Sequence, residues 1–223
     1  MKVAPPQQFP PSWFDAGCRR CSRLAAFLEE VRAAHPDYYA APVPPFGAPS
    51  AALLIVGLAP GMHGANRTGR PFTGDHAGIL LYRTLFELGL ATAPESVAAD
   101  DGLELVGCRI TNAVKCLPPA NKPLSAEVRE CRHWLAAELA ESRPRVILAL
   151  GRIAHDATLD ALRLRRAGWR FGHGAEHALP DGTRLVDSYH CSRYNTQTRR
   201  LTESMFREVA ARAAGLAGLG RDA

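Results

Sequence analysis

The chain has 223 residues, of which 47% are apolar and 22% are charged. This balance is typical of a globular protein and excludes intrinsic disorder, collagen and a coiled coil. The length suits one domain. We therefore expect residues 1–223 to form a single domain, with a Pro-rich N-terminal arm at 1–12 and a frayed tail at 215–223.

The formal net charge is +5, and all but three of the 27 Lys and Arg residues are arginine. Arginine presents a planar fork that matches phosphates, so the excess charge favours a nucleic-acid partner, although a GC-rich coding sequence gives the same composition. The longest apolar stretches are too short to cross a bilayer, and the N-terminus lacks the apolar core of a signal peptide. We expect a cytoplasmic protein with reduced cysteines and no membrane partner.

Strand-like and helix-like segments alternate along the chain. Runs rich in apolar residues predict strands at 52–57, 107–114, 145–151 and 184–189. Apolar residues at helical spacing predict five helices, at 16–34, 76–89, 126–141, 153–164 and 196–214. This order predicts an α/β fold in which a central four-stranded parallel sheet is flanked by helices.

Ligands of such sheets bind beyond the carboxyl ends of the strands, so the loops that follow the strands are candidate binding loops. The loop at 58–75 is rich in glycine, but it matches neither a Walker A loop nor GxGxxG. A loop of this length is usually functional, and its glycines allow backbone N–H groups to approach a bound group. His190 follows the fourth predicted strand, a position that favours a functional role over a structural one.

The cysteines suggest a metal site. Cys18 and Cys21 form a CxxC motif at the expected start of the first helix, and Cys116 and Cys131 follow much later in the chain. Four thiolates can hold zinc or an iron–sulfur cluster, and their spacing alone does not choose between the two. The alternative is a redox pair with two buried thiols. Cys108 lies within the second predicted strand and is expected in the core.

These segments together resemble the uracil-DNA glycosylase superfamily, and within it family 5, the B-type enzymes. GLAPG at 57–61 and PFTGDHAG at 71–78 resemble the first motif and its continuation. NAVKCLPP at 112–119 resembles the Asn-containing segment, and HCSRYN at 190–195 resembles the second motif. The four cysteines named above match the ligands of a [4Fe–4S] cluster in families 4 and 5. The resemblance therefore implies this cluster, with zinc less favoured.

The same resemblance implies a monofunctional DNA glycosylase, which flips a deaminated base out of DNA and hydrolyses its N-glycosidic bond. The substrate would be uracil, and by likeness to family 5 other deaminated bases, in double-stranded or single-stranded DNA. The enzyme would act as a monomer. The alternative is a non-catalytic, metal-stabilised DNA-binding or damage-sensing protein of the same fold. An iron–sulfur electron carrier would leave the glycine-rich loop and the His loop without a role.

The resemblance also implies roles for individual residues. Phe72 would stack on the flipped base, and Asn112 would read its Watson–Crick edge with an amide that both donates and accepts. His190 and the backbone of the first motif would donate hydrogen bonds to the departing base. The backbone segment concerned is Ala59, Pro60 and Gly61, of which the proline has no N–H.

The first motif departs from the pattern of other families. Leu58 and Ala59 stand where those families carry Asp, Asn or Glu to position the attacking water. The nearest carboxylate is Asp75, which we expect to orient a water and stabilise the sugar cation, although it also stands at an expected helix N-cap. Five residues are expected to face DNA: Arg67, Arg70, Arg193, Tyr194 and Asn195. The arginines would bind phosphate, or alternatively remain solvated surface charges.

Overall fold

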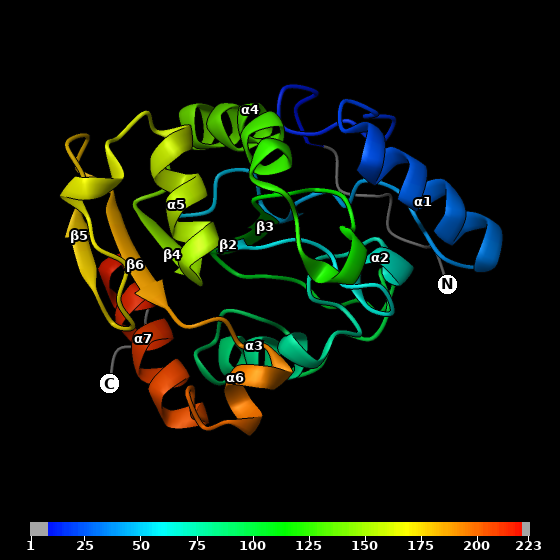
Figure 1. The fold of residues 1–223 in the computed structure, drawn as a ribbon. Helices are drawn as coiled ribbons and strands as arrows, with labels where there is room; N and C mark the ends of the chain where they lie inside the picture. Colours follow the sequence, from blue (N-terminus) through cyan, green and yellow to red (C-terminus); the bar gives the residue numbers. More distant parts are fainter. Residues whose placement is uncertain (1–8, 220–223) are drawn as a thin grey trace.

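The computed structural model describes residues 9–219 (Figure 1). Most of the predicted Pro-rich arm at 1–12 and the last four residues of the predicted tail lie outside the described residues. The prediction of fraying from 215 onward is wrong for the described part of the tail. The last helix continues to Leu216, and Ala217 is fully buried in the core.

The core of the fold is a six-stranded sheet with the order β1-β3-β2-β4-β6-β5. Its central strands are parallel, as predicted: β2 (Leu53–Gly57), β3 (Cys108–Asn112), β4 (Val146–Leu150) and β6 (Arg184–Ser188). The prediction of four strands missed two antiparallel edge strands, β1 (Phe46–Gly47) beside β3 and β5 (Glu176–Ala178) beside β6. Segments of two and three residues are too short to show a hydrophobic period.

Burial on both faces explains the apolar strands. Every residue of β2, β3 and β4 is buried. Successive side chains point to opposite faces, so Leu53 and Ile55 join one core cluster while Leu54 and Val56 join another. The continuous apolar runs therefore fill two separate cores on the two sides of one sheet.

Helices cover both faces of the sheet (Figure 1). On one face lie α3 (His76–Glu87) and α7 (Glu203–Leu216), and on the other lie α4 (Ser125–Ser142) and α5 (Arg152–Ala161). The remaining helical segments are α1 (Ser22–Ala34), α2 (Ala65–Thr68), α6 (Arg193–Gln197) and two short turns, η1 (Pro119–Asn121) and η2 (Arg166–Gly168). Within residues 9–219, no helix has the length and hydropathy that a membrane span requires.

Two predicted helices differ from the structure. The helix predicted at 16–34 begins only at Ser22, so the CxxC motif precedes it and Cys21 is its N-cap residue. The last predicted helix is divided into α6 and α7. Ser192 and Thr202 each start a helix by accepting, on the side-chain oxygen, the backbone N–H of the residue three positions later.

A buried charged network joins the sheet to α4. Arg109 Nε lies 2.8 Å from Glu138 Oε1, and both side chains are fully buried. Thr111 Oγ1 donates to the same carboxylate at 2.9 Å, and Lys115 Nζ lies 3.4 Å from it. Two cations thus compensate one buried carboxylate, which avoids the cost of an unpaired buried charge. The network fixes the segment that leads from β3 to the second pair of cysteines.

Candidate active site

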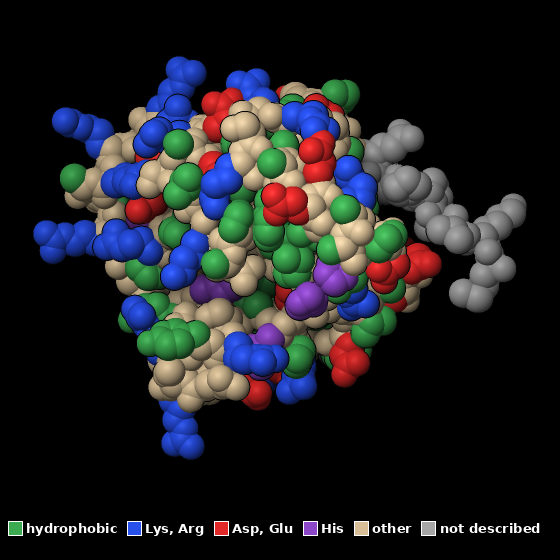
Figure 2. Space-filling model, turned by 45° about the vertical axis from the view of Figure 1, so that its right-hand side comes forward, with side chains coloured by type: hydrophobic (Ala, Val, Ile, Leu, Met, Phe, Trp, Pro, Cys, Tyr) green, Lys and Arg blue, Asp and Glu red, His purple; other side chains and the backbone are tan. Residues whose placement is uncertain are grey.

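The candidate binding loops meet at the carboxyl edge of the sheet. Strands β3 and β4 lie on opposite sides of β2, so the chain connections diverge there, which is where open α/β sheets bind ligands. Three of the eight histidines, His63, His76 and His190, belong to the loops and helix start at this edge. The face drawn in Figure 2 carries a hollow with histidine side chains around it and Lys and Arg side chains beside it.

Phe72 and Asn112, the predicted base-binding pair, both lie against Gly57. A side-chain carbon on Gly57 would lie 2.7 Å from the Phe72 ring and would collide with the Asn112 amide, so only glycine fits. Asn112 is 3% exposed, and its Oδ1 has no hydrogen-bond partner among the described residues. A buried amide oxygen is costly without a partner, which points to a ligand at this position.

His190 faces Phe72 from the segment after β6. The two ring centroids lie 5.9 Å apart with an angle of 27° between the planes. Burial lowers the pKa of His190 to about 4, so the imidazole is neutral near pH 7 and one ring nitrogen carries a proton to donate. Asn195 Nδ2 donates to the backbone carbonyl of His190 at 2.8 Å. The amide nitrogen of Asn195 thus holds the His190 backbone, and contact of Asn195 with DNA remains a prediction.

Asp75 stands at the N-cap position of α3, but its carboxylate does not cap that helix. Instead Oδ2 accepts the backbone N–H of Ala65 at 3.1 Å, and the backbone N–H of Gly61 donates to the same carboxylate. Burial raises the pKa of Asp75, against the lowering effect of these two N–H groups and of the nearby Arg67 and His63. The Gly61 N–H is thus directed at Asp75, and its contact with the departing base remains a prediction.

The segments that carry Asp75 and His190 converge. Cys191, directly after His190, is completely buried. Burial, and to a smaller extent the charge of Asp75, raises the pKa of the Cys191 thiol to about 12. The side chain of Cys191 is therefore an uncharged part of the core near pH 7, and the carboxylate lies close to the base of the His loop.

The four arginine and tyrosine residues predicted to contact DNA fall into two groups. Arg193 and Tyr194 are exposed at the start of α6, with Tyr194 70% exposed, and Arg67 is exposed on α2. Arg70 is only 4% exposed, and its guanidinium donates to partners in one neighbouring segment: Ser96, Ala99 and Asp101. Arg70 is therefore a structural residue, and the prediction that it binds phosphate is wrong.

A cluster of aromatic rings beside Asp75 was not predicted. The Tyr38 hydroxyl lies 2.9 Å from Nδ1 of His63, and His35 stacks on Tyr38 with a centroid separation of 4.5 Å. His63 is exposed, and its proximity lowers the pKa of Asp75. The sequence signal was only one histidine inside the glycine-rich loop, because the partners of that histidine come from a Pro-rich segment distant in the chain.

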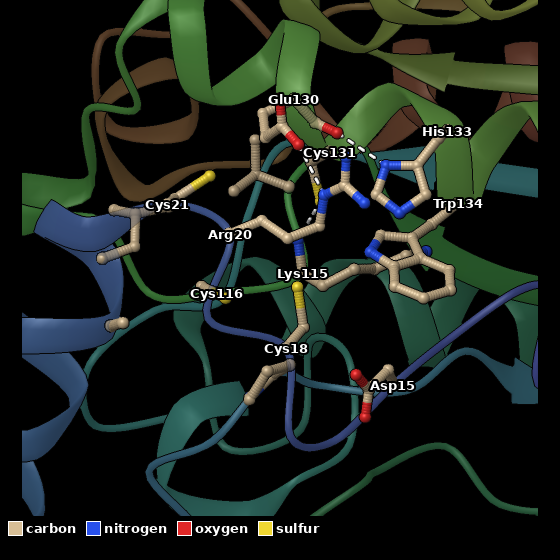
Figure 3. A pocket seen from close by; sticks show the side chains of 14 residues that line it. Asp15, Cys18, Arg20, Cys21, Lys115, Cys116, Glu130, Cys131, His133 and Trp134 are labelled. Atoms are coloured by element: carbon tan, nitrogen blue, oxygen red, sulfur yellow. Dashed lines mark hydrogen bonds and ion pairs between the residues drawn. The ribbon is translucent and has the colours of Figure 1, made fainter.

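The four cysteines predicted as ligands line one pocket (Figure 3). Cys18 and Cys21 come from the segment before α1, Cys116 comes from the chain after β3, and Cys131 comes from α4. Burial, followed by the charge of Cys131, raises the pKa of Cys21 to about 11 and also raises that of Cys116. The Lys115 backbone N–H donates to the Cys131 sulfur at 3.3 Å. Three segments of the chain thus present four thiols to a shared pocket.

These features define an α/β protein with a ligand site at the carboxyl edge, where a buried amide, an aromatic ring, a carboxylate and a neutral histidine meet. The family model of the uracil DNA glycosylase superfamily matches residues 44–214. The chain belongs to this superfamily, and the resemblance predicted from the sequence is confirmed.

Curated relatives agree with the family assignment. A type-5 uracil-DNA glycosylase from Thermus thermophilus is 52% identical, over 91% of this chain and 94% of that protein. A type-5 uracil-DNA glycosylase from Pyrobaculum aerophilum is 42% identical, over 94% of this chain and 96% of that protein. A type-4 uracil-DNA glycosylase from Sulfurisphaera tokodaii is 28% identical, over 75% of this chain. The similarity is thus greater to these type-5 proteins than to this type-4 protein.

Proposed function

We propose that the chain is a monofunctional DNA glycosylase, which removes uracil from DNA as the first step of base-excision repair. The observation that carries the proposal is the meeting of Asp75, His190 and the unpartnered Asn112 amide at the carboxyl edge of a sheet of this family. A merely DNA-binding protein of the same fold would have no use for a partly buried carboxylate and a neutral histidine at this edge.

The target base is hidden inside the duplex, so the nucleotide is flipped into the pocket before the chemistry. Phe72 supplies the stacking surface, and it is held there with φ +58, a strained conformation for a bulky residue. The free Oδ1 of Asn112 accepts a hydrogen bond from the N–H on the Watson–Crick edge of the base. This pair fixes the base against Gly57.

Hydrolysis breaks the bond between the base nitrogen and the sugar C1′, and a water oxygen forms the new bond to C1′. His190 donates a hydrogen bond to the oxygen of the departing base, which takes the electron pair and becomes anionic. The carboxylate of Asp75 orients the water and accepts its proton, and its charge stabilises the cationic sugar. Within the first motif, the Ala59 N–H remains as a backbone donor to the base, since the Gly61 N–H serves Asp75.

Release of free uracil from a labelled oligonucleotide tests this proposal directly. We expect a single turnover to yield free base and an abasic strand that remains uncut until alkali is added. Binding without release would instead favour the damage-sensing alternative. The same assay with hypoxanthine and xanthine, in duplex and single-stranded DNA, measures the breadth that we propose for deaminated bases.

The four-cysteine pocket is proposed to hold a [4Fe–4S] cluster, which would tie the N-terminal segment to β3 and α4. Among the described residues, one group of potential metal ligands has all its ligand atoms within 4.8 Å of one another: His155, His177 and Asp187. In this group each histidine is hydrogen-bonded to the Asp187 carboxylate. No three of the four cysteine sulfurs, all of them among the described residues, lie that close together. Four thiolates suit either zinc or a cluster, and the resemblance to family 5 favours the cluster.

We expect the purified protein to be brown, with broad visible absorption and iron in stoichiometric amount. Cys116→Ala should lower the iron content and the melting temperature. The excision rate per folded molecule should change much less. The matched control is Cys108→Ala, because Cys108 is buried in β3 outside the pocket and should keep its iron. A colourless wild-type protein with one zinc would contradict this prediction.

We propose that the protein binds DNA as a monomer and that the DNA crosses the carboxyl edge of the sheet. The exposed residues Arg67, Arg193 and Tyr194 would face it. Tyr194 offers the bulk that a loop needs to fill the vacated position in the base stack. The proposed cluster needs reduced thiols, which fits a cytoplasmic protein.

Affinity for DNA should fall steeply with salt, with a log–log slope of about −0.9 for each phosphate contact. Arg193→Ala should weaken binding and flatten this slope by about one contact, as measured by fluorescence anisotropy between low and moderate salt. The matched control is Arg166→Ala, because Arg166 pairs with Asp156 and Asp160 away from the loops at the carboxyl edge. An unchanged slope in the Arg193 variant would remove this residue from the DNA interface.

A further inference from the structure

The Asp75 carboxylate fills space that two glycines leave open. A side-chain carbon built on Gly61 or on Gly64 would approach the Asp75 carboxylate well inside 3.0 Å, a separation that real Cβ atoms essentially never show. In each case the three nearest atoms all belong to Asp75. The carboxylate is therefore packed directly against the backbone of the glycine-rich loop.

The same loop also holds the carboxylate by hydrogen bonds. The N–H of Ala65, the residue after Gly64, lies 3.1 Å from Oδ2, and the Gly61 N–H donates as well. Gly64 has φ −113 and ψ −104, outside the regions that residues with side chains favour. This backbone conformation turns the Ala65 N–H toward Asp75. Space, backbone direction and hydrogen bonds thus all converge on one side chain.

We propose that Gly64, together with Gly61, is a positioning residue for Asp75. The first motif carries Leu58 and Ala59, which cannot activate water, and the two glycines admit a carboxylate from residue 75 instead. This role rests on the proposed function of Asp75. Glycines on this segment thus have two roles: Gly57, at the end of β2, makes room for the base-binding residues, and Gly61 and Gly64 in the loop make room for the carboxylate.

The test is a double-mutant cycle of Gly61→Ala and Gly64→Ala with Asp75→Asn, measured as single-turnover excision of uracil from duplex DNA. We expect each alanine variant to slow excision at least about tenfold, because a displaced carboxylate misorients the water. In combination with Asp75→Asn, neither alanine should cause further loss, because the group that it displaces is already inactive. Effects that multiply would overturn the proposal.

The pH profile gives a second readout. The Ala65 and Gly61 N–H groups lower the pKa of Asp75, so a displaced but still buried carboxylate should lose its proton only at higher pH. We therefore expect the acid limb of the rate profile to move to higher pH in Gly61→Ala. A merely structural role in the loop would lower the amount of active protein and leave the limb where it is.

Two further variants separate the possible failures. Gly61 does not have a positive φ, so Gly61→Ala should fold even where the unusual backbone of Gly64 makes its variant unstable. Gly168→Ala is the matched control, because open space surrounds Gly168 and its rate should be unchanged. If Asp75→Asn itself keeps full rate, the proposed role of Asp75 fails. If Asp75→Asn is slow while the glycine effects multiply with it, only the positioning role fails.

Discussion

Replacing His190 with alanine should slow single-turnover excision of uracil by about 10²–10³, or roughly 3–4 kcal/mol of transition-state stabilisation. The ring lies against Phe72 and is neutral near pH 7, since burial lowers its pKa to about 4. It can therefore donate one hydrogen bond to charge that develops on the departing base only in the transition state. A donor of this kind acts on the rate more than on the affinity for intact substrate.

The measurement is the single-turnover rate with enzyme in excess over a uracil-containing duplex, alongside the affinity for an uncleavable analogue. His76→Ala is the matched control, because His76 is an exposed histidine at the same edge whose Nε2 lies 3.2 Å from the Thr196 hydroxyl. A His190 variant within a fewfold of wild type would leave the departing base to the Ala59 backbone N–H and contradict the assigned role.

The parts of the fold that the sequence predicted well are those with one dominant physical signal. Strand β4 is buried on both faces, so its apolar run is visible without any partner. Edge strands β1 and β5 have two and three residues, and they exist only because β3 and β6 offer free backbone groups beside them. The division between α6 and α7 depends on two local caps, Ser192 and Thr202, inside a segment whose apolar spacing looks continuous.

The candidate site was predictable in position but not in detail. Parallel strands bring their carboxyl ends to one edge, so the loops of Phe72, Asn112 and His190 had to meet. Which polar group pairs with which depends on packing between distant segments. The Arg70 guanidinium donates hydrogen bonds to the segment at 96–101, and the Asn195 amide donates to the carbonyl of His190. Both looked like surface groups because nothing local marks a buried partner.

The second large effect is expected for Asp75→Asn, which should slow excision at least about tenfold, or about 1.4 kcal/mol, while the melting temperature barely moves. Asparagine keeps the size of the side chain, and its Oδ1 can still accept the Ala65 N–H. The charge is lost, and an NH2 group replaces one of the two carboxylate oxygens. The structure removes the competing explanation of a helix cap, because the carboxylate makes no hydrogen bond to the start of α3.

The pH dependence follows from the direction of the shift. Burial raises the pKa of Asp75 in the native protein. As the pH is lowered, Asp75 should therefore become protonated, and the rate should fall, at a higher pH than for an exposed aspartate. A raised native pKa also means that ionisation of Asp75 opposes folding. Its stabilising contribution is full below the unfolded pKa and is lost as pH rises through the native value.

The Asn variant cannot ionise, so these two consequences can be measured against it. Its rate should lack the acid limb that Asp75 gives to the wild type, and its stability relative to wild type should decrease as pH falls, because protonation then relieves the wild type of a buried charge. Denaturant unfolding at neutral and at acid pH measures the second effect. A full-rate Asn variant with an unaltered acid limb would remove Asp75 from the reaction. Catalysis would then rest on His190 and the Ala59 backbone, and water would attack the sugar cation without a base.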